Sequence, residues 1–233
     1  PLLQKQLLKK TQNEYSEKER IEALMGILNT QTAEMDYSLF WNFGAYQSKA
    51  CRNAVIPFLA EHDKEAEARG VEGLKGRTAE QRLNAARVLA ILGTTGALNA
   101  LRNSIETEKD DEARDIMLAV AGDEYLAGIT ENNLPIIIAA HKKRGKLKKE
   151  LAPWLQESAL PPLFFGSGKQ LNHEEVRFIL YRMSRVKDLA TEPEIKPIIT
   201  CIDKERSASF AKDVLQRYKE AGYDAKFKFL LGV

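Results

Sequence analysis

The chain has 233 residues, 44% of them hydrophobic, so it is long enough and apolar enough to form a continuous core. Basic residues number 35 and acidic residues 33, and the net charge of +2 gives no global reason to expect a nucleic acid or an anionic membrane as partner. Cys51 and Cys201 are too few for a disulfide framework or a thiolate metal site, which favours a reducing compartment. No apolar run approaches the roughly 18 residues that a membrane span needs.

The amino-terminal part is predicted to be helical. Apolar residues at three- and four-residue spacing predict a helix over about 17–29 and another over 50–61. Pro57 removes a backbone donor from the second of these and should kink or shorten it. The charged stretch 64–69 is poor in core residues and is followed by three glycines that end at Gly76, so it is predicted to be a solvated turn or linker.

The most regular part of the chain, residues 78–121, predicts three consecutive amphipathic helices. A capping box at Thr78 opens the first helix, and Gly93 ends it. Asp110 or Asp111 caps the third helix. The distance from the cap at Thr78 to the cap at Asp110 is 32 residues, which lies in the range where repeats are expected.

The remaining part keeps the helical pattern. Helices are predicted over about 133–143, 146–155, 172–183, 195–201 and 207–221. Two β-prone runs, Ile136–Ile138 and Leu163–Phe165, are too short and too isolated to pair into a sheet. Because each helix carries one apolar stripe that it cannot bury alone, the chain is predicted to be all-α, with neighbouring helices stacked in series.

One stretch of the sequence resembles a known repeat. The start Glu80-Gln81-Arg82, the small pair Ala85-Ala86 and the end Leu92-Gly93 resemble the paired-helix HEAT repeat. Glu112-Ala113-Arg114 and Glu175-Val176-Arg177 look like weaker copies of its start. The resemblance implies a right-handed α-α superhelix, a HEAT- or armadillo-like solenoid of antiparallel helix pairs.

The carboxy-terminal third carries a second likeness. Leu160-Pro161-Pro162-Leu163, Gly168-Lys169-Gln170-Leu171 and Leu230-Leu231-Gly232 look like the helical region of bacterial proteins similar to the molybdate metabolism regulator. Those proteins are large, are often associated with a WGR domain and carry a domain of unknown function. Relatives tend to have a tryptophan in the last helices, where this chain has Tyr218 and Phe227. The likeness brings no catalytic residues.

The two likenesses predict how the chain is organised. HEAT-like helical repeats are expected over 1–157, and further helical pairs of the same solenoid over 158–233. The chain begins with Pro1 and ends on Gly232-Val233 directly after an apolar segment, so we expect a fragment of a longer polypeptide. The second likeness implies that this polypeptide is a larger cytoplasmic bacterial protein.

No catalytic, cofactor-binding or metal-binding residue is predicted. The run Gly166 to Lys169 has the glycines and the lysine of a phosphate-binding loop. However, Leu163 stands where that motif needs a glycine, and Gln170 stands where it needs a hydroxyl. The run is therefore predicted to be a tight turn between helices.

Histidine and tryptophan are assigned structural positions. The histidines have no second histidine at helical spacing, so surface or helix-cap positions are predicted for His62, His141 and His173. Trp41 and Trp154 lie among apolar residues and are predicted to pack in the core instead of anchoring a partner.

The one local charge anomaly is the basic segment 142–149. Its six basic residues are candidate contacts for a nucleic acid or another anion: Lys142, Lys143, Arg144, Lys146, Lys148 and Lys149. The alternative is a solvated turn after a helix whose carboxyl end attracts cations. We favour the turn, because Gly145 interrupts the run and no aromatic residue interleaves it for stacking on bases.

Three functions remain as hypotheses. The leading one is a non-enzymatic scaffold that binds a protein partner or other domains of the parent chain, with no cofactor, no membrane and no small-molecule substrate. The alternative is a nucleic-acid-binding solenoid that uses residues 142–149. An enzyme of base-excision type built on such a solenoid has only fold analogy behind it.

Overall fold

The computed structural model describes residues 16–29, 37, 38, 40, 41, 49–147, 153–155, 159–184 and 192–222. Within these ranges it contains eleven α-helices, one short 3-10 helix and two isolated β-bridges, and no strand. The chain is therefore all-α, as its apolar periodicity predicts. None of the helices in the described ranges is both long enough and apolar enough to cross a membrane.

The chain divides into two compact units, Pro1–Gly122 and Asp123–Val233. Each unit has its own buried apolar cluster. The predicted division after residue 157 came from the two family likenesses, and it stays a prediction.

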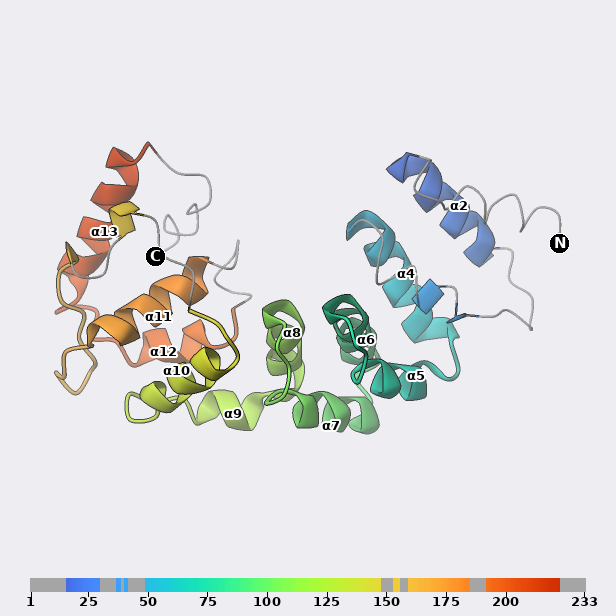
Figure 1. Ribbon diagram of the computed structural model, residues 1–233, viewed down its shortest axis with the longest axis horizontal. Coiled ribbons are helices and arrows are strands. Elements are labelled where there is room, and N and C mark those ends of the chain that lie inside the picture. The colour runs from blue at the N-terminus through green and yellow to red at the C-terminus, as the bar shows by residue number, and fades with distance from the viewer. Residues whose placement is uncertain are drawn as a thin grey trace. The chain divides into compact units, whose positions relative to one another are not determined.

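Six of these helices belong to the first unit. They are α2 (Glu17–Asn29), α4 (Lys49–His62), α5 (Ala66–Gly73), α6 (Ala79–Leu92), α7 (Thr95–Ser104) and α8 (Asp111–Ala121). Contacts join α2 to α4, α4 to α6 and α6 to α8, while α5 contacts α7. The helices of this unit thus lie in two rows, with α4, α6 and α8 in one row and α5 and α7 in the other (Figure 1).

Side-chain caps fix where these helices start and stop. The Thr78 hydroxyl accepts a hydrogen bond from the Gln81 amide (3.2 Å), and the Thr78 amide donates to the Gln81 side chain (3.3 Å). Gly93 ends α6 with φ of 60°, a left-handed conformation that glycine adopts without strain, and Thr94 caps α7 directly afterwards. Asp110 is the cap of α8. The predicted helix starts at 78 and 110 are confirmed.

The predicted apolar stripes form the core of the first unit. Ala86 and Leu89 of α6 are fully buried, and so are Leu101 of α7 and Met117 of α8. Fully burying a leucine or methionine side chain stabilises the folded state by about 1.5–3 kcal/mol. The contacts between these helices are therefore stabilised mainly by the same apolar residues whose spacing predicts the helices.

The prediction of a solvated linker after residue 63 is wrong, because the segment forms helix α5. A Cβ added to Gly70 would lie 2.7 Å from the Leu89 side chain, and one added to Gly73 would lie 2.8 Å from the Cβ of Ala85. The absence of side chains at these two positions lets α5 approach α6 closely. The prediction failed because it took glycines as turn residues, whereas here they are packing residues.

Helix α4 is not shortened by its proline. It runs from Lys49 to His62 and continues past Pro57. Pro57 has no N–H to donate to the carbonyl of Asn53, one helical turn earlier. Both residues are exposed, so water can hydrogen-bond to this carbonyl instead. Val55 and Leu59 are fully buried on the other face and hold the helix in place.

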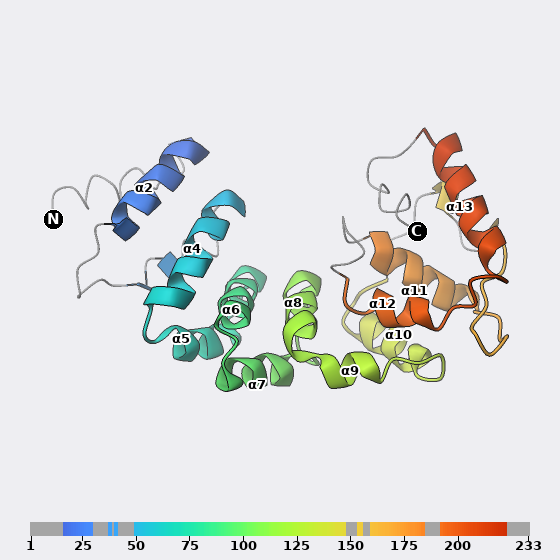
Figure 2. The ribbon, with the colours of Figure 1, turned by 180° about the vertical axis from the view of Figure 1, so that it is seen from behind.

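The second unit is built from shorter helices. They are α9 (Asp123–Ala127), α10 (Leu134–Lys143), η1 (Pro153–Leu155), α11 (His173–Ser184), α12 (Ile195–Thr200) and α13 (Ala208–Glu220). Helix α11 contacts α10 and α12, and η1 contacts α13 (Figure 2). Phe178 and Leu180 of α11 are almost fully buried in the cluster that joins these elements. The central position of α11 explains its nearly continuous burial.

One prediction for the second unit needs correction, and one short helix was not predicted. The helix predicted over 146–155 is not formed at its ends, because Lys146 and Leu147 lie in a turn and Pro153–Leu155 is a 3-10 helix. Leu147 has a φ of 65°, which is incompatible with helix. The short helix α9 was not predicted, because five residues give too few positions for a periodic pattern.

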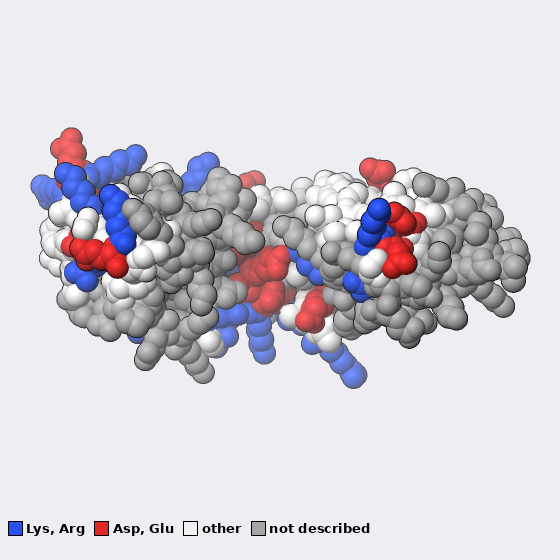
Figure 3. Space-filling model, turned by 90° about the horizontal axis from the view of Figure 1, so that it is seen from above, with Lys and Arg blue, Asp and Glu red and all other residues white. Residues whose placement is uncertain are grey.

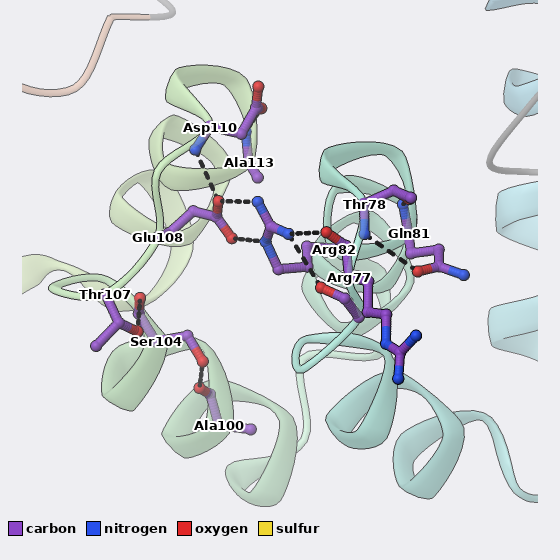
Figure 4. A network of polar contacts seen from close by, with 11 residues as sticks. Arg77, Thr78, Gln81, Arg82, Ala100, Ser104, Thr107, Glu108, Asp110 and Ala113 are labelled. Carbon is purple, nitrogen blue, oxygen red and sulfur yellow. Dashed lines mark hydrogen bonds and ion pairs between the residues drawn. The ribbon is translucent and has the colours of Figure 1, made fainter. Parts of the chain in front are cut away.

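An ion pair joins consecutive helix pairs of the first unit (Figure 4). The Arg82 guanidinium of α6 donates to both carboxylate oxygens of Glu108, at 2.8 and 3.0 Å. It also donates to the carbonyl oxygens of Gly76 (3.0 Å) and Arg77 (3.4 Å), which precede α6. Glu108 accepts in addition the backbone N–H of Asp110 (2.7 Å), the cap of α8. One arginine thus ties together the segments that lead into α6 and α8.

Hydrogen bonding keeps this pair charged. Burial raises the pKa of Glu108, but the hydrogen bonds from Arg82 and from the backbone outweigh it and bring the pKa below its usual value. The hydrogen bond to Glu108 raises the pKa of Arg82. The side chain of Glu108 is only 2% exposed, so the carboxylate depends on its partners and not on water.

Removing the arginine should therefore destabilise the first unit. In Arg82→Ala we expect the free energy of unfolding to fall by about 3 kcal/mol, because Glu108 stays buried without its cation. The measurement is urea unfolding followed by Trp41 fluorescence in a Trp154→Phe background, since the chain has no other tryptophan.

The matched control is Arg87→Ala. Arg87 also reaches from α6 to α8, but its partner Glu112 is 62% exposed, so we expect a loss below about 1 kcal/mol. Equal losses in the two variants would contradict the special role of Arg82.

Candidate functional site

Helix α10 ends inside the basic segment 142–149. The amide of Lys146 donates to the carbonyl of His141 (3.0 Å), and the amide of Gly145 donates to the carbonyl of Lys142 (2.8 Å). This pair of bonds, with Gly145 at φ of 81°, is a Schellman motif. The described part of the segment is thus a helix end followed by a turn.

The structure places four of the six predicted contact residues. They are Lys142, Lys143, Arg144 and Lys146, whereas Lys148 and Lys149 lie outside the described residues. Lys142 and Lys143 are exposed, and Arg144 and Lys146 are half-buried. Lys142 forms an ion pair with Glu174 at the start of α11. The described cations are therefore not equally available to a phosphate.

A small pocket lies beside this segment. It has a volume of about 300 Å³, and we call it the basic-segment pocket; its lining residues are Lys142, Leu147, His173, Glu174 and Arg177. Arg177 donates to the Leu147 carbonyl (3.4 Å). Cationic side chains from α10 and α11 thus reach one pocket, and the Glu174 carboxylate opposes them. Sequence reasoning found only the α10 half of this arrangement.

The glycine run before α11 forms the predicted tight turn. The Gly168 amide donates to the Phe165 carbonyl (2.8 Å), and the Phe165 amide donates to the Lys169 carbonyl (2.9 Å). Gly168 has a φ of 88°. Helix α11 then begins at its own cap, where the Asn172 side chain accepts from the Glu175 amide (3.0 Å).

A buried polar network lies in the second unit, and sequence reasoning missed it. Glu194, just before α12, accepts hydrogen bonds from the Tyr125 hydroxyl (2.6 Å) and from Nε2 of His141 (2.9 Å). The Arg182 guanidinium of α11 pairs with both Glu192 and Glu194. Four of these five side chains are fully buried, and Tyr125 is half-buried.

His141 therefore does not occupy the predicted surface or cap position. Burial lowers the pKa of His141, and the positive charges of Arg144 and Arg182 act in the same direction, while Glu194 opposes them. Burial is the largest of these effects, so the folded protein holds the imidazole neutral, with Nε2–H donating to Glu194. Its ring also packs edge-on against Phe178, with the ring centroids 4.9 Å apart.

One sequence signal could have indicated this burial. His141 lies three and four residues after Ile138 and Ile137, so it shares their apolar face of α10. Its partner Glu194 is 53 residues away in sequence, and no spacing rule links the two. The helical spacing in a single sequence indicates that such a polar residue is buried, but it does not identify the hydrogen-bond partner.

The first unit has a polar groove in the row of α4, α6 and α8. Its volume is about 250 Å³, and its lining residues are Arg52, Ala79, Glu80, Leu83, Asn84, Arg87, Asp110 and Glu112. Asn84 is 3% exposed, and its amide nitrogen donates to the Trp41 carbonyl (3.0 Å). Its side-chain oxygen is buried and has no hydrogen-bond partner among the described residues.

The remaining aromatic predictions agree with the structure. Trp41 is half-buried and donates to the Asp63 carboxylate (2.9 Å), and Trp154 packs against the core of the second unit, with its ring 6.0 Å from that of Tyr218. Both tryptophans are therefore packing residues, as predicted. His62 is exposed and stacks on Phe58.

Comparison of the chain with protein-family models, with characterised proteins and with solved structures found no match. The resemblance to HEAT repeats and to proteins similar to the molybdate metabolism regulator therefore stays a prediction. The function of the chain is inferred from its own geometry.

The neutral, buried His141 should make the second unit sensitive to acid. In the unfolded chain a histidine takes up a proton near its ordinary pKa of 6.5, whereas in the folded chain the pKa is lower. The unfolded state thus binds more protons below that pH, and stability falls as the pH drops from about 6.5 toward the folded pKa, with a slope of up to about 1.4 kcal/mol per pH unit.

His141→Gln keeps an N–H donor for Glu194 but cannot titrate, so the dependence of stability on pH should become weaker. Urea unfolding followed by Trp154 fluorescence in a Trp41→Phe background, between pH 7.5 and 5.5, measures it. His173→Gln changes an exposed histidine of the same unit and should keep the wild-type slope. Identical slopes for His141→Gln and wild type would refute the assignment.

Proposed function

We propose that the chain is a non-enzymatic scaffold, a right-handed HEAT-like solenoid of helix pairs, whose partner is another protein. The observation that carries this proposal is the row of α4, α6 and α8 in the first unit, with α5 and α7 in a second row beside it. Rows of this kind are how helical repeats bury their stripes while leaving a long surface for a partner. A larger cytoplasmic bacterial protein as the parent chain is part of the same proposal.

Equivalent residues in consecutive pairs support a repeat. The caps Thr78 and Asp110 are 32 residues apart, and so are Arg82 and Arg114. Arg114 is 2% exposed and lies at the start of α8, as Arg82 lies at the start of α6. Arg82 is half-buried, and an arginine at the same place in two successive pairs is expected of a repeated structural unit, because each pair meets its neighbour in the same way.

The polar groove is the proposed contact surface. It spans three helices of one row, with Arg52 from α4, Arg87 from α6 and Glu112 from α8. Its mixed charges suit a protein surface better than a uniformly anionic backbone.

A substitution in the groove tests this proposal. Leu83→Arg places a long charged side chain in the groove, and Leu98→Arg makes the same change at a half-buried leucine of α7, in the other row. The test is affinity isolation with cross-linking and mass spectrometry. We expect a protein that cross-links to α4, α6 or α8 with wild type and with Leu98→Arg, and at least tenfold lower recovery with Leu83→Arg.

Equal recovery of the partner with both variants would show that the groove is not the contact surface. Turnover of a substrate by the purified chain, with no protein partner recovered, would contradict the scaffold. Circular dichroism and the unfolding midpoint establish that both variants are folded.

The second candidate is nucleic-acid binding through the basic segment. The observation in its favour is the basic-segment pocket, where Lys142 and Arg177 come from different helices. Against it, Lys142 is paired with Glu174. On the face shown in Figure 3, the described Lys and Arg side chains lie in separate groups beside Asp and Glu, with no continuous basic band among the described residues.

Fluorescence anisotropy with DNA and RNA at low salt distinguishes this candidate. If the segment contacts phosphates, Lys143→Glu with Lys146→Glu should weaken binding, and the log-log salt slope should fall by about 0.9 for each lost contact to duplex DNA. Lys196→Glu with Lys219→Glu, two exposed lysines of the same unit, is the charge-matched control. Unchanged binding in the first variant would exclude the segment.

A further inference from the structure

The second unit contains an apolar pocket of about 600 Å³ among α11, α12 and α13. Eleven of the fourteen described residues that line it are apolar, so its interior offers almost no hydrogen-bonding groups. Ile179 and Met183 come from α11, Ile199 from α12, and Phe210 and Leu215 from α13. A volume of this size lies in the range of small-molecule sites, roughly 300–1,000 Å³.

The charge at this pocket has one sign. Among its described lining residues, the charged ones are Lys204, just before α13, and Lys212, within α13. Both are exposed, and neither ammonium group forms an ion pair with a carboxylate of the described residues. The third polar lining residue, Ser207, already accepts a hydrogen bond from the Phe164 amide (3.2 Å).

Two carboxylates beside these lysines in sequence are paired with arginines. Asp203, next to Lys204, pairs with Arg206 (3.4 Å), and Asp213, next to Lys212, pairs with Arg217 (2.5 Å). Glu205, on the other side of Lys204 in sequence, is exposed and is not among the described residues that line the pocket, so the charged lining residues are the two lysines. An apolar pocket bordered by two ammonium groups is complementary to a molecule with a hydrocarbon body and one anionic head.

We propose that the apolar pocket binds a free fatty acid, with the alkyl chain among α11, α12 and α13 and the carboxylate at Lys204 and Lys212. Each methylene that enters the pocket leaves water, whereas the head group stays at the exposed lysines and keeps its hydration in part. The site is separate from the partner-binding surface proposed above and does not depend on it.

Isothermal titration of the full chain with octanoate, decanoate and dodecanoate, below their micelle concentrations, tests the alkyl part. Affinity should rise by about fourfold per added methylene while the pocket still has room. Ala211→Trp fills the pocket from an exposed position of α13 and should abolish binding with an unchanged circular dichroism spectrum. Absence of heat with dodecanoate, or affinity independent of chain length, would overturn the proposal.

The head-group part has its own control. Dodecyltrimethylammonium has a dodecyl tail and a cationic head, and we expect it to bind at least tenfold more weakly than dodecanoate. Lys204→Glu with Lys212→Glu should reduce dodecanoate affinity at least tenfold. Lys196→Glu of α12 with Lys219→Glu of α13, two exposed lysines outside the lining, should not. Equal binding of both amphiphiles, or an unaffected Lys204→Glu/Lys212→Glu variant, would show unspecific adsorption and overturn the site.

Discussion

The ion pair between Arg82 and Glu108 is the constraint on which the arrangement of the first unit depends. A guanidinium presents its donors in a fixed plane, so an arginine that binds a carboxylate twice and two carbonyl oxygens once each can hold these groups only in one geometry. Those groups belong to the two segments that enter α6 and α8. Apolar burial brings the helices together without direction, and this pair sets the register between them.

The second unit uses polar groups differently. There the charged side chains of Arg182, Glu192 and Glu194 lie inside the core, and they connect α11 with the residues before α12. Charges buried in this way are costly unless each is paired, so the network fixes one arrangement of short helices that have little apolar surface of their own. The apolar pocket is lined by Ile179, Leu180 and Met183 of the same helix.

Local features were predictable from sequence, and features that join distant residues were not. The capping box at Thr78, the stop at Gly93 and the fully buried Leu89 all follow from rules that act over four residues or fewer. The partners of His141 and the lining of the apolar pocket come together only through tertiary packing. Helix α5 was missed for a related reason. Its glycines are needed for close packing against Ala85 and Leu89 of α6, and this contact is not visible in the local sequence.

The close contact between α5 and α6 has a consequence for engineering. Replacing glycine by alanine inside a helix is a common route to thermostability, because it reduces the entropy of the unfolded chain and improves helix propensity. At Gly73 the added methyl group would have to occupy space already filled by the Ala85 methyl, 2.8 Å away. A consensus or propensity-based design would therefore choose alanine at this position and would separate two helices that the native sequence keeps in contact.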